Sequence, residues 1–317
     1  MERELDFEKP LLDIEKTIQK LRYREGEGRT GHRSQIEALE NRLDTVRGEL
    51  YRNLSPWQTV QVARHPQRPV LRDYIEDIFT DFIELHGDRC FGDDQALIGG
   101  FATLGKEKVM LIGHNKGKNV EENIKRNFGM ARPEGYRKSL RLMRLAEKYC
   151  LPVITFIDTA GAFPGLDAEE RGQHEAIGRN LTEMARLKVP IVVVVTGEGG
   201  SGGALGIGVG DAVLMLQFAV YSVISPEGCA GILWRDGSFS AQAAEALKLT
   251  SASLFDLGVI DEIIPEPPGG AHRFPQQTAD GIKTAVLRHL KELTALTTAR
   301  LLAKRFEKFS AMGKFVE

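Results

Sequence analysis

The sequence of 317 residues has few cysteines and no long apolar run. Cys90, Cys150 and Cys229 lie far apart and form no C-x-x-C pair, which argues against a zinc ribbon and against a disulfide framework. The longest apolar runs, such as residues 191–195, are far too short to span a bilayer. We therefore expect a protein of a reducing cytoplasm, with no metal on this chain and no membrane partner.

An excess of charge of either sign is also missing. Lys and Arg together number 42, and Asp and Glu together number 44. This balance removes the electrostatic reason to expect nucleic acid as the main partner. The length is sufficient for one large domain or two ordinary ones with a sizeable core.

The chain divides into three zones, which we expect at residues 1–55, 56–265 and 266–317. In the first zone, apolar residues recur at spacings of three and four on both sides of a polar stretch at residues 22–31. The recurring residues are Leu11, Ile14, Ile18, Leu21, Ile36, Leu39, Leu43, Val46 and Leu50. This pattern predicts a helical hairpin with a flexible turn. A bare surface hairpin and a partner-binding hairpin both remain open.

The second zone alternates apolar runs with helical patterns, which predicts a largely parallel sheet covered by helices. Helices are expected over residues 133–150 and 169–187. The expected strands are residues 100–104, 109–113, 153–157, 191–195, 212–216, 221–224 and 259–264. After the Pro- and Gly-rich breaker at residues 265–270, a C-terminal helical extension is expected, with one break near residues 294–298.

Two strand-to-helix loops carry most of the chemical information. Residues 158–165 and 197–204 each follow an apolar strand, at the end where open α/β sheets bind ligands. Glycines let a ligand approach the main chain, and backbone amides without an acceptor can stabilise an oxyanion. The eight glycines between Gly197 and Gly210 exceed what tight packing alone requires. The second loop therefore predicts a backbone-amide oxyanion site.

The second loop also contains two short motifs that point elsewhere. The letters G-x-G-x-x-G beginning at Gly197 match a dinucleotide fingerprint, but the next strand, at residues 220–224, ends without the required carboxylate. The letters G-x-S-x-G around Ser201 match a nucleophile elbow, which needs a histidine later in the chain. His272 and His289 lie outside the predicted sheet. Both interpretations are disfavoured.

Longer motifs resemble the α subunits of bacterial-type acetyl-CoA carboxylase carboxyltransferase. The matching stretches are FIDTAGAFPG, AEERGQHEAIGRNL, GEGGSGGALGIGVGD, YSVISPEGCAGILW and LFDLGVIDEIIPEPPGGAHR, with RDYIEDIFTDFIELHGDRCFGDD and NFGMARPEGYRKSLRLMRLAEKY upstream. The resemblance covers nearly the whole chain. One departure is Ala160, where we expect many relatives to carry proline. It removes no hydrogen-bond donor, because proline has none.

The resemblance implies an α/β fold of the crotonase (ClpP)-like class, a superhelix of ββα units with an N-terminal helical hairpin and a C-terminal helix. It implies transfer of the carboxyl group from carboxybiotin, held on a biotin carrier protein and not covalently on this chain, to acetyl-CoA. The product is malonyl-CoA, in the first committed step of fatty acid synthesis. It also implies an α2β2 assembly, in which a zinc-ribbon β subunit supplies the other half of each site, with biotin carboxylase in the wider complex.

By motif position, Gly202 and Gly203 are the expected oxyanion-hole amides. The expected binding residues around them are Gly161, Ala162, Phe163, Pro164, Gly165, Gly199, Gly200, Ser201 and Ala204. His114 and Glu198 are expected in structural roles. A set of basic residues is expected either on a solvated face or against CoA phosphates, namely Arg126, Arg132, Arg137 and Lys138.

Two other functions remain open. One is a stand-alone crotonase-like hydrolase or isomerase of acyl-CoA with its own carboxylate base. The other is a non-catalytic scaffold that docks the biotin carrier protein.

Overall fold

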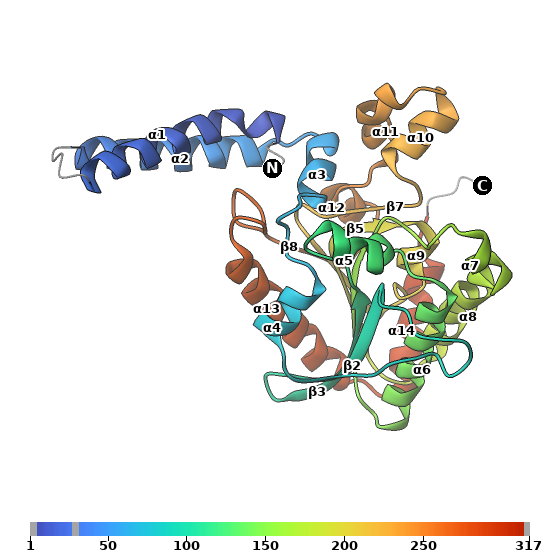
Figure 1. The fold of residues 1–317 in the computed structure, drawn as a ribbon. Helices are drawn as coiled ribbons and strands as arrows, with labels where there is room; N and C mark the ends of the chain where they lie inside the picture. The colour runs from blue at the N-terminus through green and yellow to red at the C-terminus, as the bar shows by residue number, and fades with distance from the viewer. Residues whose placement is uncertain (1–4, 27–31, 314–317) are drawn as a thin grey trace.

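The computed structural model describes residues 5–26 and 32–313, and within them an eight-stranded sheet forms the centre (Figure 1). The strand order is β1-β2-β3-β4-β5-β6-β8, and β7 pairs with β5. The first three strands are antiparallel, and every pair from β3 onward is parallel. The strands are β1 (Thr80–Glu84), β2 (Leu97–Leu104), β3 (Glu107–His114), β4 (Val153–Thr159), β5 (Ile191–Gly200), β6 (Ala212–Leu216), β7 (Val220–Ser222) and β8 (Glu262–Ile264). The prediction of a largely parallel sheet is confirmed.

Helices cover both faces of this sheet (Figure 1). On one face lie α4 (Leu71–Ile78) and α13 (Pro275–Thr294), and on the other lie α6 (Pro133–Lys148), α8 (Gln173–Arg186) and α14 (Thr298–Ser310). Every residue of β4, β5 and β6 is buried, as expected for parallel strands between two helical layers. The C-terminal helix α13 contributes to the same hydrophobic core. The boundaries of the three predicted zones stay a prediction.

The N-terminal hairpin projects from this body (Figure 1). It consists of α1 (Lys9–Gly26) and α2 (Arg33–Arg52), and Ile18 and Ile36 are buried between the two helices. The predicted hairpin is confirmed, while residues 27–31 of its predicted turn lie outside the described residues. The next helix, α3 (Pro56–Ala63), begins with a capping box of Ser55 and Gln58, which satisfies amides of its first turn.

A small helical lobe follows β7 (Figure 1). It contains α10 (Pro226–Leu233) and α11 (Ser240–Leu247), and α12 (Ser251–Asp256) leads back to the sheet. The Ser225 hydroxyl caps α10 by accepting from the Gly228 amide at 3.1 Å. The prediction of a helix start at Pro226 is confirmed. The short helix α5 (Val120–Lys125) follows β3.

Two predicted elements differ from the structure. The helix expected over residues 169–187 is divided into α7 (Leu166–Glu170) and α8, because Gly172 has a φ of 82° and ends the first helix. The strand expected over residues 191–195 continues to Gly200, because residues 198–200 pair with β7. The first glycines of the predicted turn are therefore part of the sheet.

Other differences lie at the ends and edges of the sheet. The strands expected at residues 221–224 and 259–264 are shortened to β7 and β8. The edge strand β1 has no counterpart in the prediction, because its side chains are largely exposed and form no apolar run. In the described ranges, no helix has the length and apolar character needed to cross a membrane.

Candidate functional site

The two glycine-bearing loops meet at the carboxyl ends of β4 and β5. A Cβ atom on Gly200 would lie 2.1 Å from the carbonyl oxygen of Ala160, and one on Gly203 would lie 2.3 Å from the carbonyl carbon of Gly161. Such distances leave no room for a side chain, so both positions require glycine. The structure thus brings the two predicted loops together as backbone against backbone, with residues 160–162 against Gly200 and Gly203.

The short helix α9 (Ser201–Leu205) opens directly from this contact. The amides of Ser201, Gly202 and Gly203 belong to its first turn and have no carbonyl within the helix to bond. Because α9 has only five residues, its helix dipole is small. Hydrogen bonds from these individual amides are therefore its main means of stabilising an anion. Gly203 is buried, whereas Gly202 is partly exposed and would have 3.9 Å of clearance from Ile177 to an added Cβ.

An apolar groove of about 300 Å³ runs beside α9. Burial raises the pKa of Tyr221 to about 12, so its phenol is neutral at physiological pH. The main lining residues are Ser201, Gly202, Leu205, Tyr221, Val223 and Leu254. Ser201 and Gly202, in the first turn of α9, therefore lie in the wall of a groove whose other walls are mainly apolar.

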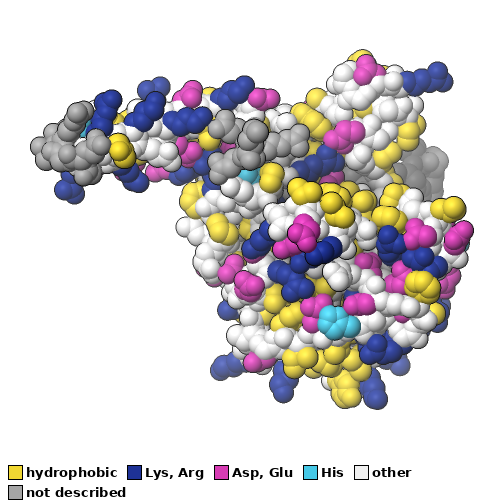
Figure 2. Space-filling model, in the orientation of Figure 1, with side chains coloured by type: hydrophobic (Ala, Val, Ile, Leu, Met, Phe, Trp, Pro, Cys, Tyr) yellow, Lys and Arg dark blue, Asp and Glu magenta, His cyan; other side chains and the backbone are white. Residues whose placement is uncertain are grey.

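Exposed apolar side chains continue around this groove. Figure 2 shows hydrophobic side chains gathered between the region of α5 and the α10–α11 lobe. The exposed large apolar residues of α5, α9, α10 and the segments next to them are Val120, Ile124, Phe128, Leu205, Val223, Ile232 and Leu233. A contiguous surface of this kind marks an interaction site rather than an ordinary solvated face.

Two buried side chains support α9 from beneath. The Tyr136 hydroxyl donates to the carbonyl oxygen of Gly203 at 3.2 Å, and the Asn180 amide donates to that of Gly206 at 2.9 Å. Both side chains are fully buried, and burial raises the pKa of Tyr136. These positioning residues come from α6 and α8. The sequence motifs give no signal for them beyond their positions on predicted helices.

His114 lies at the end of β3, in the layer beneath α9. It is 1% exposed, beside the backbone of Gly203 and Phe156, and its ring nitrogens have no partner of normal hydrogen-bond geometry among the described residues. Burial lowers its pKa to about 4, so the imidazole is neutral at pH 7. The ring fills space under the loop, which agrees with the expected structural role.

Carboxylates also stand near the glycine loops, but each has a cation. Asp158 Oδ1 accepts from Lys116 Nζ at 2.6 Å and from the Glu198 amide at 2.9 Å. Glu198 Oε1 accepts from Arg64 Nε at 3.0 Å, and a second Arg64 nitrogen reaches Glu227 at 2.6 Å. These ion pairs line a second cavity of about 390 Å³. The structural role expected for Glu198 fits this arrangement.

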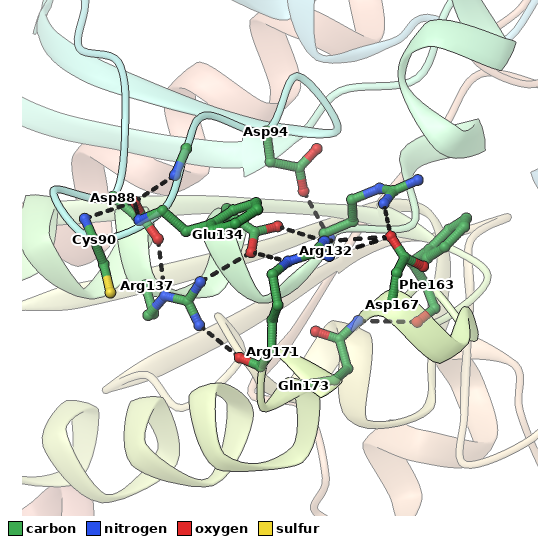
Figure 3. A network of polar contacts seen from close by, with 12 residues as sticks. Asp88, Cys90, Asp94, Arg132, Glu134, Arg137, Phe163, Asp167, Arg171 and Gln173 are labelled. Atoms are coloured by element: carbon green, nitrogen blue, oxygen red, sulfur yellow. Dashed lines mark hydrogen bonds and ion pairs between the residues drawn. The ribbon is translucent and has the colours of Figure 1, made fainter. Parts of the chain in front are cut away.

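A polar network fixes the loop after β4 (Figure 3). The Arg132 guanidinium lies 4.2 Å from the centre of the Phe163 ring and pairs with Asp167. Gln173 Nε2 donates to the carbonyl oxygens of Phe163, at 3.1 Å, and of Ala131, at 2.8 Å. Phe163 and Pro164 line neither of the two cavities above. Their placement makes them supports of the loop, and the motifs gave no indication of the role of Gln173.

The basic residues considered for CoA phosphates are spread over separate ion pairs. Arg126 pairs with Glu122, Arg132 with Asp167, Arg137 with Asp88 and Lys138 with Asp93. Lys138 is completely buried, so it is neither on a solvated face nor available to a ligand. These four side chains form no common anion site.

The two short motifs are not completed by the structure. No histidine lines the groove that contains Ser201. His289 Nε2 lies 2.6 Å from a Glu262 oxygen, and His272 stacks on His65 with ring centres 4.0 Å apart. The described residues also contain no cluster of three or more His, Cys, Asp or Glu side chains suited to a metal ion.

Comparison with known proteins agrees with the long motifs. Residues 4–313 match the family described as acetyl co-enzyme A carboxylase carboxyltransferase-like. The chain belongs to this family. It is 57% identical over 314 residues to the acetyl-coenzyme A carboxylase carboxyl transferase subunit alpha of Geobacter metallireducens, covering 99% of this chain and 98% of the relative. It is 55% identical over 315 residues to the protein of the same name from Halalkalibacterium halodurans, covering 99% and 97%.

Solved structures with the same fold include other carboxyltransferases. Transcarboxylase 12S with methylmalonyl-coenzyme A bound aligns with a TM-score of 0.54 at 20% identity, over 68% of this chain and 41% of that one. A Pseudomonas malonate decarboxylase heterotetramer with coenzyme A aligns with a TM-score of 0.54 at 16% identity, over 68% and 86%. The crotonase-like fold class and the carboxyltransferase family, both expected from the sequence, are confirmed.

Proposed function

We propose that this chain is the α subunit of an acetyl-CoA carboxylase carboxyltransferase, which moves a carboxyl group from carboxybiotin on a biotin carrier protein to acetyl-CoA and so forms malonyl-CoA. The observation that carries the proposal is the first turn of α9, which packs against the loop after β4 at Gly203 and lines an apolar groove with Ser201 and Gly202. A site of this kind stabilises negative charge and performs no proton transfer of its own.

The residues present fit a biotin ureido group. When bound, carboxybiotin supplies the carboxyl group and a ureido oxygen on which negative charge develops. The amides of Gly202 and Gly203 would donate to that oxygen, while the close approach at Gly200 and Gly203 keeps the two loops in contact. Gly161, Ala162, Gly165 and Gly199 would shape the backbone around the group. The apolar groove walls lower the local dielectric and strengthen these hydrogen bonds.

The open groove and the apolar surface around it support the proposal of a partner. A β subunit with a zinc ribbon would cover this surface in an α2β2 assembly and supply most of the contacts to acetyl-CoA. The exposed side chains of Val223, Ile232 and Leu233 are suited to the core of such an interface. The carrier protein would present its biotin at the groove after loading by biotin carboxylase.

A stand-alone acyl-CoA hydrolase or isomerase has weaker support. Such an enzyme needs a carboxylate base within reach of the substrate. Asp158 and Glu198, which lie in the two loops, are each held by a cation: Asp158 by Lys116 and Glu198 by Arg64. Asp158 also accepts from the Glu198 amide. Neither faces the groove beside α9.

Assays of the chain alone and with a β subunit separate the candidate functions. The readout is carboxyl transfer from malonyl-CoA to biocytin. Activity only in the mixture is the expected result. Activity of the chain alone would favour the stand-alone enzyme, and absence of activity in both would favour a scaffold.

The amide of Gly202 can be tested separately. In the assembled complex, Gly202→Pro removes the N–H, and we expect kcat to fall by about 10²–10³-fold. Gly202→Ala is the matched control, because it keeps the N–H and its Cβ has room. A proline at Gly203 would be a poor test, since even a Cβ there meets the Gly161 backbone. Equal rates for the two Gly202 variants, with thermal melts like that of the parent, would contradict the assignment.

A further inference from the structure

An open pocket of about 270 Å³ lies between α6, α8 and the loop that precedes β2. Five guanidinium groups line it, those of Arg89, Arg137, Arg141, Arg144 and Arg179. The pocket shares no lining residue with the groove beside α9 or with the cavity around Asp158. It is therefore a separate feature of this chain, and no step of the proposed reaction uses it.

Three of the five arginines have carboxylate partners. Arg137 bonds Asp88 at 2.8 Å and Glu134 at 2.9 Å (Figure 3), Arg144 reaches Glu183 at 3.1 Å, and Arg179 lies 3.9 Å from Glu175. These pairs hold their side chains along the walls of the pocket.

The other two arginines contact only backbone oxygens within the described chain. Arg89 Nη1 donates to the carbonyl oxygen of His86 at 2.8 Å. Arg141 donates to the carbonyl oxygens of Gly87, at 3.0 Å from Nε, and of His86, at 3.2 Å from Nη2. Both side chains are anchored, and neither has an ion pair of its own in the described chain. The one carboxylate that lines the pocket, Asp88, is bonded to Arg137. Two oriented guanidinium groups without a carboxylate partner of their own favour an external anion.

The loop that carries Arg89 is held in a strained conformation. Arg89 has a φ of 63°, in the left-handed region that a side chain disfavours. Asp88 Oδ1 maintains it by accepting from the amides of Cys90, Phe91 and Gly92 at 2.8–3.0 Å, while Arg137 secures the second carboxylate oxygen. These contacts fix the position of the Arg89 backbone at the edge of the pocket.

We propose that this pocket binds a phosphorylated small molecule through a phosphate or diphosphate group. Guanidinium forks match the oxygen geometry of phosphate and bind it in bidentate fashion. The size of the pocket suits a small ligand, and the net charge of −2 on the whole chain gives no broad positive field for a nucleic acid. The ligand and the carboxyl-transfer substrates therefore occupy different sites.

Calorimetric titration of the full-length chain with inorganic pyrophosphate tests this proposal. Chloride replaces pyrophosphate in the reference titration, at a constant ionic strength of about 0.15 M. We expect saturable binding at one site. R89Q and R141Q should each weaken it about tenfold, since a charge-assisted hydrogen bond contributes on that scale. The matched control is R186Q, which changes an exposed arginine on α8 outside the pocket and should bind like the parent.

Absence of saturable binding, or affinities of R89Q and R141Q equal to that of the parent, would overturn the proposal. If either variant loses its folded thermal transition, NMR of the parent decides instead, with pyrophosphate expected to shift the Nε–H signals of Arg89 and Arg141. Carboxyl transfer by R89Q mixed with a β subunit should match the parent. Unchanged carboxyl transfer by a variant with weakened pyrophosphate binding would show that the two activities are separate. The phosphate-site proposal can then fail without affecting the proposed carboxyltransferase function.

Discussion

The loop after β4 and the loop after β5 use glycine for different reasons. Gly161, in the first loop, has a φ of 156° and nothing within 4 Å of the position that a Cβ would occupy. Gly203, in the second loop, has no room for a Cβ because the Gly161 backbone is already there. The first loop needs glycine for its conformation, and the second needs it for close approach.

The supports of the two loops differ in the same way. A network of charged side chains and Gln173 fixes the first loop from outside (Figure 3). Two neutral side chains, Tyr136 and Asn180, hold the second from within the core. Both sets come mainly from α6, α8 and the turns that precede them. One helical layer therefore sets the position of both walls of the candidate site.

Gly203→Ala should have the largest effect on this arrangement. The new Cβ would overlap the backbone of Gly161 and Ala162 at 2.3–2.4 Å, and rigid backbone yields less readily than a side chain. We expect a loss of more than about 3 kcal/mol in the free energy of unfolding, at or above the usual range for overpacking. Urea unfolding monitored by circular dichroism measures it.

Gly178→Ala is the control for this substitution, because it adds the same atom on α8 with nothing within 4 Å. It should be neutral or stabilising by up to about 1 kcal/mol. A Gly203→Ala protein as stable as the parent would mean that the two loops can separate. Lack of space would then not be the reason for glycine at position 203.

His114, beneath the second loop, should make stability depend on pH. Its folded-state pKa of about 4 lies below the ordinary value of 6.5, so the unfolded chain binds the proton more readily. Stability from the neutral ring is complete above pH 6.5 and falls as the pH drops toward 4, by about 3 kcal/mol at pH 4. Urea midpoints measured between pH 7 and pH 4 test this.

His114→Gln should reduce the loss of stability between pH 6.5 and pH 4. His272, whose pKa burial lowers to about 3, remains in the variant and accounts for a residual slope. If parent and variant lose stability in parallel between pH 6.5 and 4, then His114 is not neutral in the folded protein.

Much of the framework was predictable because its signals are local. The apolar runs of β4, β5 and β6 predict buried parallel strands, and the three- and four-residue spacings predict the hairpin of α1 and α2. The break expected near residues 294–298 separates α13 from α14. Since parallel strands end at one edge of a sheet, the meeting of the two loops also followed from their order in the chain.

The parts that were not predictable depend on contacts between distant residues. Residues 198–200 belong to a strand because they pair with β7, and an isolated glycine run contains no such information. Tyr136 and Asn180 act on α9 from 67 and 26 residues away. Their spacing along helices predicts burial but not the carbonyl oxygen to which each donates. The pocket of five arginines likewise combines one loop and two helices.

Gly161→Ala should give the smallest effect and the sharpest contrast with Gly203→Ala. Because no atom lies within 4 Å of the new Cβ, the cost is only the strain of a φ of 156° on a residue with a side chain, about 1–2 kcal/mol. The same urea experiment measures it. A loss as large as that of Gly203→Ala would show that the first loop is also limited by space. The expected milder loss would establish that conformation, not packing, selects glycine after β4.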